Sequence, residues 1–225
     1  MGTVIINSDT TKNPITMIGK YAGECWGSNT SDDSKNYKRG IECLRNQHGR
    51  TFEYPDVYMT IDGYSARVIR EWYTHIGGSP TRLQASTRYI NYNDFEYVVP
   101  PSINKNSTAK NEFTTVMETI KSSLSVLENM KIPKEDLAML LPLGMTTKIV
   151  CKHNLRNLMD MSHQRMCNRA YWEYRELFED VCIALSQYSN EWKYIVDNYF
   201  MPKCEILGGC PESKGCGKYP LLEKL

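Results

Sequence analysis

Residues 71–89 read EWYTHIGGSPTRLQASTRY and join a predicted helix to a predicted strand through a pair of glycines. The helix is expected over residues 63–75, with Asp62 as its cap and with Gly77 and Gly78 at its end. A glycine-rich turn exposes backbone N–H groups, and Ser, Thr and Arg side chains add further donors. The segment therefore favours binding of a phosphate monoester or a diphosphate. Its candidate ligands are His75, Ser79, Thr81, Arg82, Gln84, Ser86, Thr87 and Arg88.

Two common phosphate-binding motifs do not match this segment. No Gly-Lys-Thr or Gly-Lys-Ser follows the glycines, so the segment is not a Walker loop. The order helix, loop, strand is the reverse of the dinucleotide-binding fingerprint, in which a strand precedes the glycines. The alternative interpretation is a connection whose polar residues are solvated.

A second polar segment, residues 153–173, reads HNLRNLMDMSHQRMCNRAYWE. Residues three and four apart share one face of a helix, so Asn154 and Arg165 are expected on one side, followed by Arg169 if the helix continues. An arginine on a partly apolar face is costly unless it meets an anion. The segment therefore predicts a second set of anion contacts, and the alternative is a surface helix with solvated arginines.

Strand-like patterns are short. Val57, Met59 and Ile61 alternate with polar residues, as in a half-buried strand. Further strands are expected at residues 87–91, 95–99 and 146–152. The polar stretch 29–38 is expected to form an exposed loop.

Helical patterns fill most of the remaining chain. They are expected at residues 40–47, 109–130, 133–141, 154–166, 169–188 and 190–199, with Pro133 as the first residue of its helix. The mixture predicts an α+β fold in which an antiparallel sheet packs with helices. We expect one domain over residues 1–200, followed by a Cys- and Gly-rich tail over 201–225.

Composition narrows the functional class. The chain has 225 residues, with 24% charged and 41% hydrophobic, a balance typical of globular proteins. The 27 Lys and Arg against 26 Asp and Glu give a net charge of +1, which argues against a general nucleic-acid-binding surface. No apolar run is long enough for a membrane span. The first ten residues lack a signal-peptide pattern, and the expected location is the cytoplasm.

The last three of the eight cysteines, Cys204, Cys210 and Cys216, form the pattern C-x5-C-x5-C. The other five are scattered, and cysteines of a cytoplasmic protein are expected to be reduced. A structural zinc site usually has four ligands with closer pairs, so no metal is expected and the tail cysteines are expected to be free thiols. A metal site and a disulfide are the two alternatives for the tail.

Taken together, the two polar segments resemble the flavin-dependent thymidylate synthases, the ThyX family. The family's first motif is similar to Thr74-His75-Ile76, Ser79 and Ser86-Thr87-Arg88-Tyr89. Its second motif is similar to Asn154-Leu155-Arg156-Asn157-Leu158, Arg165 and Ala170-Tyr171-Trp172-Glu173. Residues 48–54 and Leu141-Pro142-Leu143 stand where the family has two further blocks. The resemblance covers residues 40–175 with all four blocks in order.

The chain departs from the family at several motif positions. Thr74 and Ile76 replace two arginines, an Asn-Glu pair is absent, and extra residues follow Ser79. Arg82 lies in that longer stretch and is expected to restore one missing charge. The other replacements in the motifs are Tyr54, Asp160, Met161 and Tyr171.

The resemblance implies methylation of dUMP to dTMP. It implies 5,10-methylenetetrahydrofolate as the carbon donor and FAD, reduced by NADPH or NADH, as the hydride donor. It also implies a homotetramer with active sites at subunit interfaces and no cysteine nucleophile. The cofactor supplies the chemistry, and the protein orients the ligands and stabilises charge on the pyrimidine.

Carried over position by position, the resemblance gives Arg165 the catalytic role. Its guanidinium would contact the uracil ring and stabilise negative charge on a carbonyl. Arg88 would hold the dUMP phosphate as a bidentate clamp. The other dUMP-binding residues would be Glu71, Gln84, Ser86 and Thr87. The FAD contacts would be Tyr54, His75, Ser79, Arg82, Asn154, Arg156, Asp160 and Arg169.

Two alternatives remain open at this point. One is a related pyrimidine nucleotide C5-modifying enzyme on the same scaffold, such as a dUMP hydroxymethylase. The other is a non-catalytic nucleotide-binding homologue, motivated by the missing arginines at positions 74 and 76. The presence of Ser86, Arg88 and Arg165 argues against the second alternative.

Overall fold

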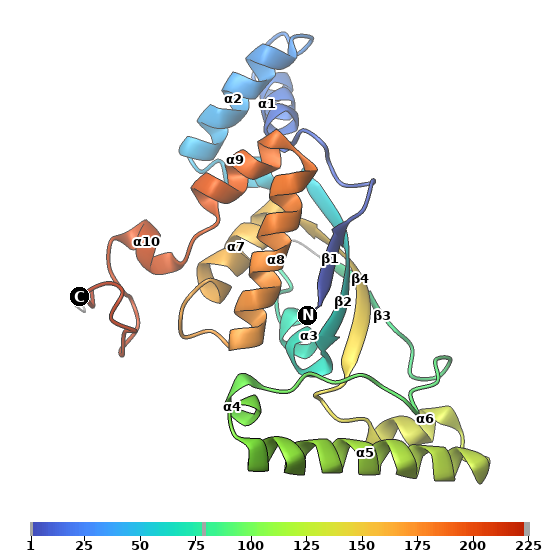
Figure 1. Ribbon diagram of the computed structural model, residues 1–225. Coiled ribbons are helices and arrows are strands. Elements are labelled where there is room, and N and C mark those ends of the chain that lie inside the picture. Colours follow the sequence, from blue (N-terminus) through green and yellow to red (C-terminus); the bar gives the residue numbers. More distant parts are fainter. Residues whose placement is uncertain (1, 78–79, 223–225) are drawn as a thin grey trace. The chain divides into compact units, whose positions relative to one another are not determined.

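The structure is a computed structural model that describes residues 2–77 and 80–222 (Figure 1). Its contacts divide the chain into two compact units. Unit 1 consists of Met1–Thr3, Ile61–Tyr73 and Leu83–Val150. Unit 2 consists of Val4–Thr60, Thr74–Arg82 and Cys151–Leu225.

Among the described residues, four strands form one sheet in the order β1-β2-β4-β3. They are β1 (Thr3–Ile6), β2 (Asp56–Ser65), β4 (Thr146–Asn154) and β3 (Thr81–Gln84). On β2, the side chains of Val57, Met59 and Ile61 are fully buried, which confirms the strand predicted from their alternation. Helices make up most of the other regular structure, and the predicted α+β class is confirmed.

Two helices of unit 2, α1 (Pro14–Cys25) and α2 (Asp33–Arg45), pack in close contact. A β-carbon at Gly19 would lie 1.8 Å from the carbonyl oxygen of Asn36. A β-carbon at Gly40 would lie 2.0 Å from the carbonyl oxygen of Ile15. The two glycines therefore permit a backbone approach that any side chain would block. The sequence patterns did not predict α1.

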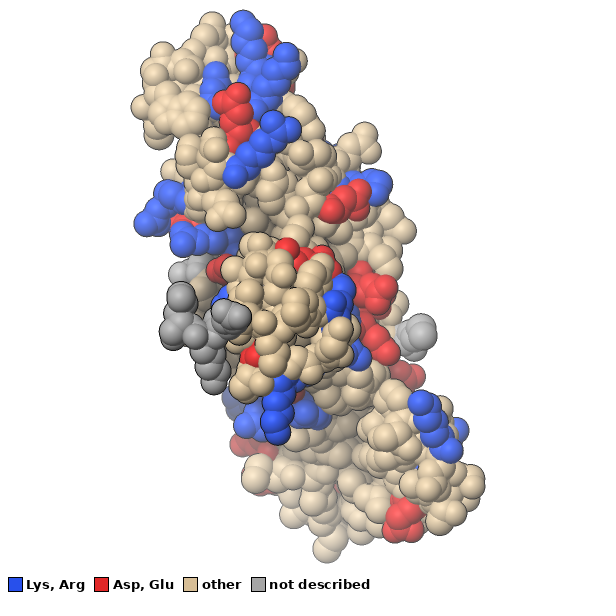
Figure 2. Space-filling view, turned by 90° about the vertical axis from the view of Figure 1, so that its left-hand side faces the viewer, with Lys and Arg blue, Asp and Glu red and all other residues tan. Residues whose placement is uncertain are grey.

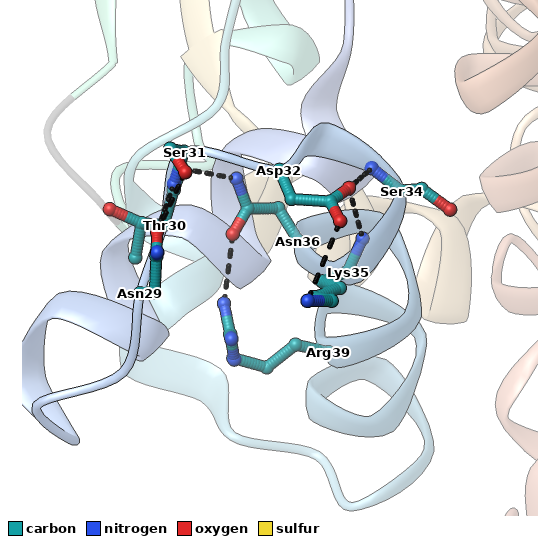
Figure 3. Close-up of polar contacts among 8 residues, drawn as sticks. All are labelled: Asn29, Thr30, Ser31, Asp32, Ser34, Lys35, Asn36 and Arg39. Carbon is teal, nitrogen blue, oxygen red and sulfur yellow. Dashed lines mark hydrogen bonds and ion pairs between the residues drawn. The ribbon is translucent and has the colours of Figure 1, made fainter.

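The loop expected over the polar stretch 29–38 is confirmed for residues 29–32 and wrong for 33–38, which form the first turns of α2 (Figure 3). Oδ1 of Asp32 accepts a hydrogen bond of 2.9 Å from the backbone N–H of Ser34 and caps the helix. The amide of Asn36 is fully buried, and its oxygen accepts from Nη1 of Arg39 at 2.8 Å. These local partners satisfy polar groups that a loop would leave to water.

Helix α3 (Ala66–Trp72) is shorter than predicted because β2 runs on past Asp62. Within β2, Gly63 has a φ of +78°, in the left-handed region that favours glycine. The hydroxyl of Ser65 then accepts a hydrogen bond of 3.2 Å from the first turn of the helix. Ser65 is therefore the cap in place of Asp62, whose carboxylate instead pairs with Lys148 at 2.7 Å.

Unit 1 contains α4 (Pro101–Asn104), α5 (Ser107–Asn129), α6 (Lys134–Leu137) and the 3-10 turn η2 (Ala138–Leu140). Helix α5 begins at its cap Asn106 and confirms the long helix predicted there. Pro133 precedes α6 as its N-cap, one position earlier than expected.

The strands expected at residues 87–91 and 95–99 are wrong. In this part of the described chain, Tyr97 forms an isolated bridge to Met145. Phe95 packs into a buried cluster with Met145 and side chains of α5 and α6. The aromatic residues that suggested strands serve a hydrophobic core instead, because side-chain burial outweighs β-propensity.

After β4 the chain forms α7 (Leu155–Arg165), α8 (Trp172–Tyr188), α9 (Asn190–Tyr199) and α10 (Lys203–Leu207). Of the helices predicted here, the one expected from residue 169 begins at Trp172. The segment after α10 closes on itself, since the backbone N–H of Cys210 donates to the carbonyl of Pro220 at 2.7 Å. The division of the chain at residue 200 stays a prediction.

The distribution of charged side chains on the surface agrees with the nearly balanced numbers of basic and acidic residues in the sequence. On the face drawn in Figure 2, basic and acidic side chains are interspersed. None of the described helices combines the length and the apolar character needed to cross a membrane.

Candidate functional site

A cavity of about 910 Å³ in unit 2 collects residues from four segments. They are the 3-10 helix η1 (Gly49–Glu53), the loop after α3, helix α7, and the segment from the end of α9 to α10. The predicted residues His75, Arg156 and Asp160 all line this cavity. Its apolar lining includes Phe52, Ile76, Met201, Ile206 and Leu207, and its donors include Gln164, Asn198 and Lys203.

Helix α7 is fixed at its start by buried polar groups. The side chain of Asn154 caps it by accepting the backbone N–H of Asn157 at 2.9 Å. Nδ1 of the buried His153 bonds to the amide oxygen of Asn157. Burial lowers the pKa of His153 to about 4, so the ring is neutral. Since an amide oxygen can only accept, the proton lies on Nδ1.

In the first two turns of α7, Arg156 and Asp160 are four residues apart and both line the cavity. Nη1 of Arg156 pairs with a carboxylate oxygen of Glu53 at 2.6 Å. Arg50 pairs with the other oxygen at 2.9 Å. The hydrogen bond from Arg156 lowers the pKa of Glu53, so the carboxylate is ionised and holds Arg156 against η1.

At the end of α7, Arg165 contacts two rings. Its Nε–H donates to Nε2 of His75 at 2.9 Å. Its guanidinium carbon lies 4.5 Å from the ring centroid of Tyr174 on α8. Burial, together with the charges of Arg165 and Arg82, lowers the pKa of His75 to about 4. His75 is therefore a neutral acceptor for Arg165.

A second cavity of about 510 Å³ in unit 2 contains Arg165 and Arg169 in its lining. Nη1 of Arg169 donates to the carbonyl of Lys214 in the tail. The three tail cysteines and Cys167 also line this cavity, and all eight cysteines are free thiols. Within the described residues no group of three His, Cys, Asp or Glu is placed to hold a metal ion.

Two other predicted FAD contacts, Tyr54 and Arg82, belong to unit 2. The ring of Tyr54 is half exposed and packs 4.7 Å from the ring of Tyr21. Arg82 is partly buried on β3 and close enough to His75 to lower its pKa. Ser79 lies outside the described residues.

The predicted dUMP-binding residues other than Arg165 belong to unit 1. Nε of Arg88 pairs with Glu135 at 2.9 Å on the surface. The hydroxyl of Ser86 accepts the backbone N–H of Arg88 at 3.2 Å and shapes the turn around it. The remaining three have separate positions: Glu71 pairs with Arg67, Gln84 bonds to Thr147, and Thr87 lines a small cavity.

Comparison with known proteins places this chain in a family. The family profile described as "Thymidylate synthase complementing protein" matches residues 8–188. The chain belongs to this family.

Named relatives of this chain share one description. The "Flavin-dependent thymidylate synthase" of Pyrococcus horikoshii is 34% identical over 76% of this chain and 73% of its own length. The protein of that name from Nitratidesulfovibrio vulgaris is 28% identical over 91% of this chain and 86% of its own length. Among solved structures, the ThyX protein of Helicobacter pylori complexed with FAD and dUMP has a TM-score of 0.69. It is 19% identical, covers 88% of this chain and 99% of its own, and supports the fold.

Several residues around the two cavities were not predicted from the sequence. Glu53 orients Arg156, Tyr174 contacts Arg165, and the segment from Asn198 to Leu207 forms a wall of the larger cavity. The spacing of Arg50 and Glu53 is a weak signal for an ion pair. No signal in the sequence brings α10 and residues 74–77 to the same cavity, because the two segments are far apart in the chain.

Proposed function

We propose that this chain is a flavin-dependent thymidylate synthase that converts dUMP to dTMP. The observation that carries the proposal is the family match over residues 8–188, with His75, Arg156 and Asp160 of both motifs gathered in one cavity. The co-substrate would be 5,10-methylenetetrahydrofolate, and NADPH or NADH would reduce the flavin. We also propose a cytoplasmic location.

The lining of the larger cavity fits FAD. Its volume falls in the range of cofactor sites. The apolar lining suits an isoalloxazine ring, and the donors Arg156, Gln164 and Lys203 suit its carbonyls or a diphosphate. Bound FAD would supply the hydride that completes the methyl group. Arg156, Asp160 and His75 would hold it, with Asn154 fixing the start of α7.

Arg165 would act on the pyrimidine. A guanidinium beside the uracil stabilises negative charge on a ring carbonyl and favours attack from C5 on the one-carbon unit. Because His75 is neutral, it does not compensate the positive charge of Arg165. Its hydrogen bond to Nε of Arg165 orients the guanidinium. No described cysteine is needed for this step.

Arg88 would bind the dUMP phosphate, and Ser86 would fix the turn that presents it. Because Arg88 is paired with Glu135, phosphate binding exchanges one anionic partner for another. A phosphate monoester can carry two negative charges and accept two parallel hydrogen bonds from the planar guanidinium, so it can displace the singly charged carboxylate. Glu71, Gln84 and Thr87 are the further residues that we propose for nucleotide binding.

The active unit would be a homotetramer with sites at subunit interfaces. Ile76, Leu83 and Tyr89, all beside or within the first motif, are 72%, 71% and 80% exposed. Large apolar side chains of this kind at a binding segment support coverage by another subunit.

The test is a visible absorption spectrum of the purified chain, recorded before and after addition of FAD and then dUMP. We expect a bound oxidised-flavin spectrum that shifts with dUMP, followed by dTMP formation when methylenetetrahydrofolate and NADPH are added. A flavin shift with a hydroxymethylated product would indicate a dUMP hydroxymethylase. Failure to bind flavin would instead support a non-catalytic homologue.

A further inference from the structure

We propose that Tyr174 is a positioning residue that fixes the guanidinium plane of Arg165 for the pyrimidine nucleotide. The inference rests on the proposed function and adds a residue that neither motif predicted. Tyr174 lies in the first turn of α8 and is fully buried.

Three side chains from three elements meet here. Cζ of Arg165, at the end of α7, lies 4.5 Å from the ring centroid of Tyr174. The imidazole of His75, from the loop after α3, lies 5.9 Å from the same ring at an interplanar angle of 66°. Arg165 also donates to His75 at 2.9 Å. Tyr174 thus contacts both the cation and the group that accepts its hydrogen bond.

This arrangement restrains Arg165 in two directions. The bond to His75 fixes Nε, and the aromatic face covers one side of the guanidinium. A planar group held at one edge and one face keeps its Nη atoms pointed in a constant direction. Arg165 is the last residue of α7 and is followed by an irregular segment. Without the ring its side chain would be less restrained, and nucleotide binding would have to order it at a cost in conformational entropy.

Helix α8 provides a matched control. Phe178 lies one turn after Tyr174, is also fully buried, and packs 5.9 Å from Phe200. Leucine in either position removes one buried ring from the same helix, but Arg165 loses its aromatic contact in the first case alone.

The experiment compares Tyr174→Leu, Tyr174→Phe and Phe178→Leu in the FAD-loaded chain by calorimetric titration with dUMP and by thermal unfolding. We expect Tyr174→Leu to weaken dUMP binding roughly three- to thirtyfold, the range of a cation–π contact. Tyr174→Phe keeps the ring and should retain the affinity, and Phe178→Leu should lower Tm without weakening dUMP binding. Equal loss of affinity in Tyr174→Leu and Phe178→Leu would overturn the proposal. Tyr174→Met, whose unbranched and flexible side chain can fill an irregular space, replaces the leucine variant if that variant does not fold.

A second readout does not depend on dUMP. The Nε–H signal of Arg165 in an NMR spectrum, assigned by its loss in Arg165→Lys, should be shifted by the ring of Tyr174. The shift should vanish in Tyr174→Leu and remain in Phe178→Leu; persistence in both would contradict the inference. If the wild-type chain binds no dUMP, the proposed function fails, while this signal still tests the role of Tyr174.

Discussion

Nε of Arg165 donates a hydrogen bond of 2.9 Å to Nε2 of His75, a residue 90 positions earlier in the chain. An imidazole accepts at this atom when the ring is neutral. Burial, with the charges of Arg165 and Arg82, lowers the pKa of His75 to about 4, and burial lowers that of His153 to about 4. Two neutral histidines therefore flank helix α7.

We expect the free energy of unfolding to decrease as the pH falls from about 6.5 to about 4. In this range the unfolded chain binds protons at both histidines while the folded chain does not, so acid favours unfolding. Below pH 4 both states are protonated and this contribution no longer changes. For His153 the loss is about 3 kcal/mol or less.

Denaturant titrations at pH 7 and pH 4.5 measure this loss in the wild-type chain and in His153→Gln, which cannot titrate at that position. The wild-type chain should lose more stability than the variant between the two values. Equal losses would show that the protonation of His153 does not differ between the folded and unfolded states.

Arg165→Ala should abolish dTMP formation and leave FAD largely bound. The variant removes the charge that would stabilise the pyrimidine but keeps Arg156 and Asp160 in the larger cavity. Product analysis and flavin absorbance after gel filtration measure the two effects. Arg175→Ala, on α8, is the control and should retain turnover; wild-type turnover in Arg165→Ala would remove its assigned role.

Arg82→Ala should weaken binding of FAD or dUMP by roughly tenfold, as expected for loss of a charged hydrogen bond. Arg82 stands in the first motif, where the family's arginines at positions 74 and 76 are missing. Flavin absorbance titrations give both affinities, and the exposed Arg70 provides a control substitution. Unchanged affinity for both ligands would make Arg82 an ordinary strand residue.

Gly19→Ala should destabilise the chain by about 1–3 kcal/mol, the usual cost of overpacking. The new β-carbon would meet the backbone of α2 at 1.8 Å, and backbone cannot move aside as a side chain can. Gly23→Ala is the control on the same helix, because its β-carbon would meet the flexible end of Arg39. In denaturant unfolding, the free energy of unfolding of Gly19→Ala should be well below that of Gly23→Ala. The reverse order would contradict the close contact between α1 and α2.

Exposed cysteines should react with a thiol reagent faster than buried ones. Burial raises the pKa of the Cys182 thiol to about 12, which leaves it about a thousandfold less thiolate than an ordinary thiol of pKa 9.0. Cys25 and Cys216 are exposed. In a thiol titration at pH 8 these two should react first, and Cys182 should react after unfolding; Cys25→Ser and Cys216→Ser identify the fast signals. A fast-reacting Cys182 would contradict its buried position.

Periodicity and capping chemistry in the sequence determined much of the fold. The alternation at Val57, Met59 and Ile61 predicted β2, and the apolar spacing of residues 109–130 predicted α5. These signals are reliable because they reflect one buried face of a local element. The motif around residues 153–165 likewise predicted helix α7 and three of the residues that line the two cavities, namely Arg156, Asp160 and Arg165.

Tertiary contacts determined the rest. Helix α1 has no side-chain cap of its own; the carboxylate of Glu191, 176 residues away, accepts the backbone N–H of Ile15 at 2.7 Å. Residues 87–99 have strand-like composition, yet Phe95 packs in the core of unit 1. His75, Arg165 and Tyr174 come from three elements, and nothing in local spacing pairs them. Local sequence fixes an element when its partners lie within a few residues, whereas a cap, a core contact or an ion pair formed across the chain exists only after the chain has folded.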